Sequence, residues 1–142
     1  MIKRIKSNIL MRYDEEEKCT PYLDCSAHDA AQAAVNVAKT NYNNAKALCK
    51  ALRAEMDNVK SVVNDYKEIY DRVAECGPSV NSPAITGRLS GMIDCACNYG
   101  SSVESSYNQS ISELDRCTAE LQKAQIKLAN TPCVWECRWL TC

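Results

Sequence analysis

The chain of 142 residues contains no phenylalanine, only four glycines and four prolines, and a single histidine. So few turn-forming residues argue against a turn-rich all-β fold, and the balance of the common residues favours helix. Because phenylalanine is absent, the core has to be built from Ala, Val, Leu, Tyr and cystine. We therefore expect a mainly helical protein with a thin core.

The sequence also lacks a strong net charge and a long apolar run. The formal net charge of -1 and the pI near 5.9 argue against a basic field over the whole molecule and against an acidic disordered chain. No segment approaches the length of a membrane span. In the basic start of the chain only Ile9, Leu10 and Met11 form an apolar run, whereas a signal peptide needs about 7 to 15 apolar residues, so none is predicted.

Catalytic and metal-binding patterns are missing as well. His28 is the only histidine that could act as a base beside a nucleophile, and the first turn of a helix, where it is predicted to lie, disfavours its cation. Zinc knuckles need Cys-x2-Cys pairs, but the closest spacings here are Cys95-x-Cys97, Cys133-x3-Cys137 and Cys137-x4-Cys142. We predict no enzyme activity, no cofactor and no metal. A thiol-exchange enzyme acting through Cys95 and Cys97 is the catalytic alternative.

Cysteine is the residue that the chain has in excess. The ten cysteines stand in near-mirror order about the middle of the chain: Cys19, Cys25, Cys49, Cys76, Cys95, Cys97, Cys117, Cys133, Cys137 and Cys142. An even number at this density indicates disulfide bonds, each contributing about 2 to 4 kcal/mol to stability. It also indicates an oxidising compartment: the extracellular space, a periplasm, a virion or cell surface, or a hyperthermophile cytosol.

A chain folded back on itself would join these cysteines in nested pairs: Cys19–Cys142, Cys25–Cys137, Cys49–Cys117 and Cys76–Cys97. Cys95 and Cys133 are then left over, although Cys95 can exchange roles with Cys97, and Cys133 with Cys137. The leftover thiols are expected at opposite ends of the molecule, too far apart to bond within it. They therefore bond differently, stay reduced or join two subunits.

Residues 26 to 76 are predicted to form one long helix. Ser26 and Asp29 resemble a capping box, and Cys76-Gly77-Pro78 supplies a stop. Apolar residues recur every seven positions in three rows: Ala38, Ala45, Leu52, Val59, Tyr66 and Val73; Leu48, Val62 and Ile69; and Tyr42, Cys49, Met56, Val63 and Tyr70. Since Asn41 and Glu55 interrupt the second row, the stripe is wider than a coiled-coil seam. A helix of roughly 75 Å needs a partner.

The partner is predicted at residues 102 to 130, where Ser101 and Glu104 form a capping box. The apolar residues of this segment also recur every seven positions: Tyr107, Leu114, Leu121 and Leu128, with Ile111, Cys117 and Ala124 beside them. Because Cys49 and Cys117 both lie on apolar stripes, a disulfide between the two helices is predicted.

Residues 79 to 100 are less regular. A short helix can start at Ser82-Pro83, but three glycines weaken it. If this segment continued the second helix without a break, Cys49 would face about residue 110, roughly 10 Å short of Cys117. The Cys49–Cys117 bond therefore requires about seven residues of slack in this segment.

These patterns together predict an all-α fold. We expect an elongated antiparallel helical hairpin or, if residues 83 to 97 fold back, a three-helix bundle, stapled by about five disulfides. Residues 1–18 form a basic N-terminal arm, and residues 19–142 form the disulfide-stapled helical domain. Residues 131 to 142 are expected to be a short turn of helix or an irregular tail, held against residues 19 to 25.

Two segments are candidates for binding a partner. In the arm, apolar residues share one helical face with cations around them: Ile2, Lys3, Arg4, Ile5, Lys6 and Ile9. The arm fits a neighbouring subunit, an anionic membrane surface or nucleic acid, or else it is a frayed tail. Trp135 and Trp139 are four residues apart, and on a helix they either cover the open end of the hairpin or form an aromatic hot spot.

The absence of a catalytic set, the covalent cross-links and the basic arm favour a structural or interaction protein. We expect a subunit, cement or minor component, such as a capsid component, of an extracellular or virion assembly, with other protein subunits as its partners. The alternative is a secreted monomeric effector, toxin or small-ligand carrier whose helices splay around an apolar pocket.

Overall fold

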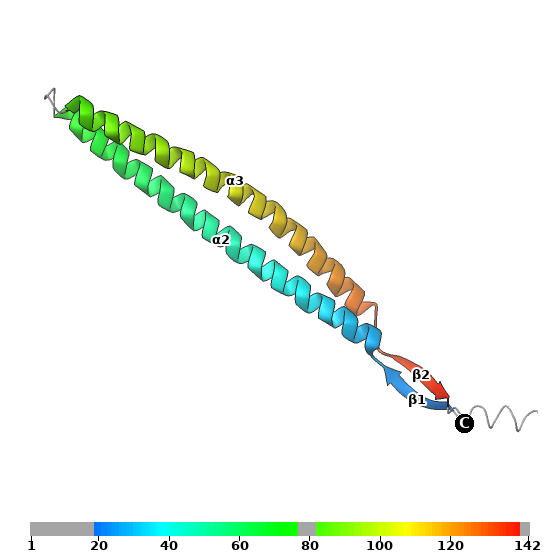
Figure 1. Ribbon diagram of the computed structural model, residues 1–142. Helices are drawn as coiled ribbons and strands as arrows, with labels where there is room; N and C mark the ends of the chain where they lie inside the picture. Colours follow the sequence, from blue (N-terminus) through cyan, green and yellow to red (C-terminus); the bar gives the residue numbers. More distant parts are fainter. Residues whose placement is uncertain (1–18, 77–81, 140–142) are drawn as a thin grey trace, which may run out of the picture. The chain divides into compact units, whose positions relative to one another are not determined.

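The computed structural model of the chain describes residues 19–76 and 82–139. In chain order the elements are β1 (Cys19–Asp24), α2 (Ser26–Glu75), α3 (Ser82–Ala129) and β2 (Val134–Trp139) (Figure 1). The two long helices pack as a hairpin, so the predicted mainly helical, disulfide-bonded fold is confirmed. The predicted arm and Cys142 lie outside the described residues.

The chain falls into two compact units. The terminal unit holds β1, β2, the start of α2 up to residue 37 and the end of α3 from residue 122. The hairpin unit holds the remainder of both helices, from residue 38 of α2 and up to residue 121 of α3. Both disulfides belong to the terminal unit, so within the described residues the hairpin unit is held together without a covalent cross-link.

The start of α2 at Ser26 agrees with the sequence prediction, although a different residue caps it. Asp24 Oδ1 accepts hydrogen bonds from the Ser26 hydroxyl at 2.6 Å and from the Ser26 backbone N–H at 2.9 Å. These bonds favour the carboxylate and lower the pKa of Asp24. A side-chain acceptor just ahead of the first turn satisfies a backbone N–H that has no partner within the helix.

Helix α3 is continuous from Ser82 to Ala129, so the predicted three-helix bundle is wrong. Residues 83 to 97, which that alternative folded back, belong to the helix, and so do Gly87, Gly91 and Gly100. A glycine inside a helix costs only about 1 kcal/mol relative to alanine, which is less than the cost of ending one helix and starting another.

Gly100 is where α2 and α3 come close together. A Cβ atom on this residue would lie 3.0 Å from Val59 Cγ1, whereas one on Gly87 or Gly91 would meet nothing within 4 Å. Glycine at position 100 therefore lets the helix backbone approach Val59, while the hairpin's own packing does not require the other two glycines.

The core of the hairpin unit is a narrow seam of small side chains. Its buried apolar residues are Ala38, Ala45, Cys49, Val63, Leu89, Val103 and Cys117. On α2 they belong to the first and third predicted rows, whereas Leu48, Val62 and Ile69 of the second row are exposed. No large side chain in the described residues is fully enclosed. Helix α3 therefore covers only part of the wide apolar stripe that the sequence predicts on α2.

Candidate functional site

Strands β1 and β2 pair antiparallel and form a two-stranded ribbon in the terminal unit. The sequence prediction of a helical turn or an irregular tail in residues 131 to 142 is wrong for residues 134 to 139. Valine and tryptophan prefer extended backbone, and pairing with β1 satisfies the backbone groups of this segment. Pro21 is tolerated because a two-stranded ribbon consists of edge strands.

Two disulfides close the ribbon, and one of them differs from the predicted pairs. Cys19 bonds Cys137, with 5.2 Å between the Cα atoms, and Cys25 bonds Cys133, with 4.3 Å between them. The predicted pair Cys19–Cys142 is therefore wrong, whereas Cys25 bonds Cys133, the predicted alternative to Cys137. The physical cause is the strand register: Asp24 lies opposite Val134, so the next residue, Cys25, reaches Cys133.

One face of the ribbon carries a polar cluster. The Tyr22 hydroxyl donates to Glu136 Oε2 at 3.1 Å, and the Arg138 guanidinium lies 5.1 Å from the centre of the Tyr22 ring. The hydrogen bond to the carboxylate raises the pKa of Tyr22. Sequence reasoning missed this cluster, because without the strand register nothing placed Tyr22 opposite Glu136.

The other face carries the disulfides and an exposed apolar pair. Leu23 and Trp135 lie directly opposite each other, and their exposed fractions are 47% and 73%. Trp139, the other candidate tryptophan, pairs with Cys19 in the strand register. Trp135 does not close the end of a helical core.

His28, the only histidine, lies between the two helix ends of the terminal unit. Its Nδ1 is 2.9 Å from the carbonyl oxygen of Thr131. Since a carbonyl oxygen only accepts hydrogen bonds, this ring nitrogen carries the proton and donates it. The contact ties the first turn of α2 to the residues that follow α3.

Buried thiols in the hairpin unit replace the predicted bond between the helices. Cys49 and Cys117 are both free, and Cys49 Sγ donates to Ser110 Oγ at 3.2 Å. The Ser110 hydroxyl in turn donates to the Tyr107 carbonyl at 2.6 Å. Burial raises the pKa of the Cys117 thiol, and the nearby Glu113 carboxylate adds to the effect.

The thiols of Cys76, Cys95 and Cys97 are free and exposed, so the predicted Cys76–Cys97 bond is absent as well. Cys95 and Cys97 are two positions apart on a helix, which turns their side chains to different sides. They do not form a dithiol centre. Within residues 19–76 and 82–139, no group of three or more potential ligands is placed to hold a metal ion.

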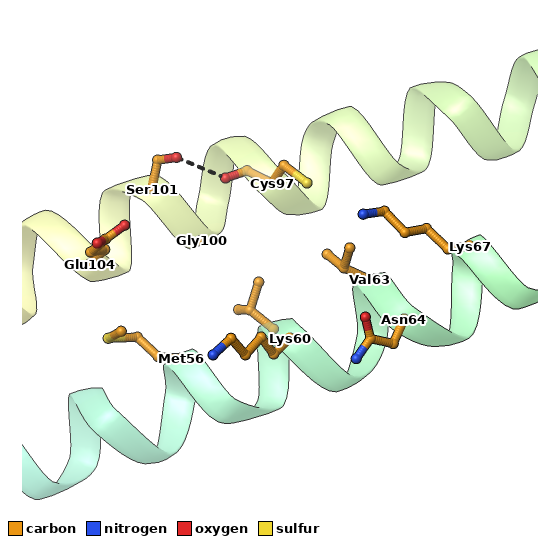
Figure 2. A pocket seen from close by; sticks show the side chains of 10 residues that line it. Met56, Lys60, Val63, Asn64, Lys67, Cys97, Gly100, Ser101 and Glu104 are labelled. Carbon is orange, nitrogen blue, oxygen red and sulfur yellow. Dashed lines mark hydrogen bonds between the residues drawn. The ribbon is translucent and has the colours of Figure 1, made fainter.

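Helices α2 and α3 leave a groove of about 400 Å³ on one side of the hairpin unit (Figure 2). Met56, Val59 and Val63 provide its apolar part. Its polar lining consists of Lys60, Asn64, Lys67, Ser101 and Glu104, and Cys97 and Gly100 complete it. The Ser101 hydroxyl donates to the Cys97 carbonyl at 3.1 Å, so it is already satisfied within α3.

Neither described helix has an apolar stretch of the length and hydropathy that crossing a membrane requires. Comparisons of the chain with protein-family models, with curated proteins and with solved structures found no match.

Proposed function

We propose that this chain is a non-enzymatic structural or interaction protein, a subunit, cement or minor component of an extracellular or virion assembly. The observation that carries the proposal is the exposed Trp135 opposite Leu23 on a ribbon closed by two disulfides. Tryptophan is the residue most enriched in binding hot spots, and a strand that is already fixed loses little conformational entropy when it binds.

The disulfides support the compartment in this proposal. They join residues 118 and 108 positions apart, so each restricts a long loop of the unfolded chain. Bonds of this kind persist in oxidising surroundings such as the extracellular space. A component of an external assembly gains from them because its ends remain joined when the protein is heated or attacked by proteases.

The basic arm, residues 1–18, supplies a second contact in this proposal. Its alternating apolar and cationic residues suit a groove on another protein subunit, and this is the partner that we favour. A membrane surface or nucleic acid is a weaker alternative for the arm, since the chain as a whole carries a formal net charge of -1.

Site-specific photocrosslinking tests the ribbon as a contact. A photoreactive phenylalanine is placed at position 135 in the full chain, and at position 134 as the control, because Val134 is exposed at the same end of the ribbon but points to its other face. Crosslinking in the native extracellular or virion fraction should give adducts of discrete mass from position 135 and few from position 134. Equal yields at both positions, or chains of monomer mass at both, would contradict the proposal.

The alternative, a secreted monomeric effector, toxin or small-ligand carrier, has one specific observation in its favour. The groove lined by Met56, Val59 and Val63 has a volume within the range of ligand sites, and Lys60 and Lys67 could attract an anionic head group. An anionic fluorescent fatty-acid probe tests it. Saturable binding that Lys60→Glu and Lys67→Glu each weaken, by a chain of monomer mass, would favour the carrier.

A further inference from the structure

Exposed apolar side chains stand in one row on each helix of the hairpin unit. We call the two rows the apolar face and define it by five residues: Val62 and Ile69 on α2, and Ile85, Met92 and Tyr99 on α3. On each helix these residues are seven positions apart. Sequence reasoning noted the α2 row but not the α3 row, although the same seven-residue spacing marks both.

The two rows lie side by side. Val62 and Tyr99 line the same small groove, of about 170 Å³, together with Ala96. The Tyr99 hydroxyl donates to Glu55 Oε1 at 2.9 Å. Glu55 therefore marks the border of the apolar face, and its carboxylate already has a partner there.

The exposed fractions show that packing within the hairpin leaves the side chains of this face about half exposed. Val62, Met92 and Tyr99 are 42%, 46% and 52% exposed, and the five residues carry no charge. The seam beneath them is made of small side chains, with no large residue fully enclosed and no disulfide in the described part of the hairpin unit. Two helices cannot enclose a core by themselves, whereas four helices can.

We propose that a second copy of this chain packs on the apolar face, so that two hairpin units form a four-helix bundle. The hairpin already mates a seven-residue row of α2 with an antiparallel row of α3. A two-fold axis parallel to the helices repeats that pairing, because it places α2 of one copy against α3 of the other. The inference extends the proposed function by naming one of its partner subunits.

The area of the face suits a dimer. An aromatic side chain buries about 150 to 250 Å² when fully enclosed, and a Val, Ile or Met side chain roughly 60 to 120 Å². The five half-exposed residues therefore offer on the order of 250 Å² per copy. A standard interface takes about 800 Å² from each partner, and slightly more than half of that area is apolar. The apolar face therefore supplies about half of the apolar area of such an interface, and the flanking positions of both helices supply the remainder.

Sedimentation of the full chain, with its free thiols alkylated, tests the proposal. Interfaces of standard size have dissociation constants from µM to pM, so at up to about 100 µM the wild type should reach twice the chain mass of 15.8 kDa. Met92→Glu and Ile69→Glu should each raise the dimer dissociation constant at least tenfold and leave the helical circular dichroism unchanged. Ile111→Glu is the matched control, because Ile111 is 38% exposed and lies seven positions beyond Glu104, which lines the groove on the other side.

Thiol crosslinking provides a readout that does not depend on charged variants. Cys95 is three positions from Met92 and four from Tyr99, so it lies at the rim of the apolar face, whereas Cys97 lines the opposite groove. In a chain with Cys76→Ser and Cys142→Ser, a short bismaleimide should trap the dimer. Cys95→Ser should abolish the trapped dimer, and Cys97→Ser should leave its yield unchanged.

A wild type of monomer mass at every concentration would overturn the inference. The inference would also be overturned if Ile111→Glu dissociated the dimer while Met92→Glu did not. Crosslinking of the dimer through Cys97 alone would overturn it as well. Each of these results leaves the proposed role of Trp135 intact, since that role is tested by crosslinking to other components at the ribbon. If the chain still dimerised but the photoreactive residue at position 135 gave no adducts, the proposed function would be contradicted and the dimer would stand.

Discussion

Cys49 on α2 faces Ser110 on α3, and the distance of 3.2 Å between Sγ and Oγ fixes the register of the hairpin unit. The contact lies where an uninterrupted second helix places it, about two turns from Cys117. The slack that the sequence analysis required therefore does not exist, and neither does the bond that required it. Cys117 instead lies beside a pocket lined by Asn41, Asn44 and Leu48.

Replacing Ser110 by cysteine should create the bond that Cys117 cannot make. In Ser110→Cys the new thiol lies opposite Cys49, and mild oxidation should join them and close a loop of about 60 residues, which stabilises the chain by about 4 kcal/mol in the chain-entropy model. Peptide mapping and a rise in the thermal midpoint check this. Ser112→Cys is the control, since Ser112 is exposed on α3 and its hydroxyl contacts only Asn108 of the same helix.

The sequence predicted most of the helical fold, because its signals are local. The seven-residue rows and the residues near Ser26 determine helix type and the start of α2 without reference to distant residues. The pairing of cysteines is different, since it depends on register. A shift of a few residues on one strand or helix changes every partner, as with Cys19, which bonds Cys137 rather than the predicted Cys142.

The candidate sites were predictable to a smaller extent. The sequence predicts Trp135 as a contact residue, but its strand and its exposure follow from pairing with β1, which lies more than a hundred residues away in sequence. A short Val- and Trp-containing segment is ambiguous between strand and helix until its partner is known. The same holds for the apolar face, because the sequence shows rows of apolar residues but not which row α3 covers.

Native alkylation should separate the free thiols into two classes. With maleimide at neutral pH, Cys95, Cys97 and Cys76 should react within minutes, because they are exposed. Cys49 and Cys117 should react at least tenfold more slowly, since both are buried and burial raises the pKa of Cys117, which lowers its thiolate fraction. Mass spectrometry of peptides gives each rate. If Cys49 and Cys117 stayed unlabelled after denaturation without a reductant, they would be disulfide-bonded, contrary to the register described above.

Substitution by alanine should change the free energy of unfolding differently at Gly91 and at Gly100 of α3. Gly91→Ala should stabilise the chain by about 1 kcal/mol, because alanine is the better helix former and nothing lies within 4 Å of the new methyl group. Gly100→Ala should gain at least 1 kcal/mol less, since its Cβ would lie 3.0 Å from Val59 Cγ1.

Chemical denaturation of both glycine variants measures this difference, and Val59→Ala supplies the control. In the Val59→Ala background the methyl group at position 100 has room, so the two glycine substitutions should become equal in effect. A gain from Gly100→Ala that is as large in the wild type as in that background would mean that the helices do not approach closely at this point.

The acid sensitivity of the α2 start should depend on Asp24. Hydrogen bonds from the Ser26 side chain and backbone lower the pKa of this carboxyl below its ordinary value of 3.8. A group whose pKa is lower in the folded state stabilises that state above its unfolded pKa, and the stabilisation is lost as the pH falls through the folded pKa.

Carboxyl NMR titration should therefore place the pKa of Asp24 below 3.8 in the wild type. Ser26→Ala should move this pKa back toward 3.8, because the hydroxyl makes the larger contribution. Thr20→Ala, on the same face of β1 but without a hydrogen bond to Asp24 in the described contacts, should leave the titration unchanged. An Asp24 pKa at or above 3.8 in the wild type would show that the aspartate does not cap α2 in solution.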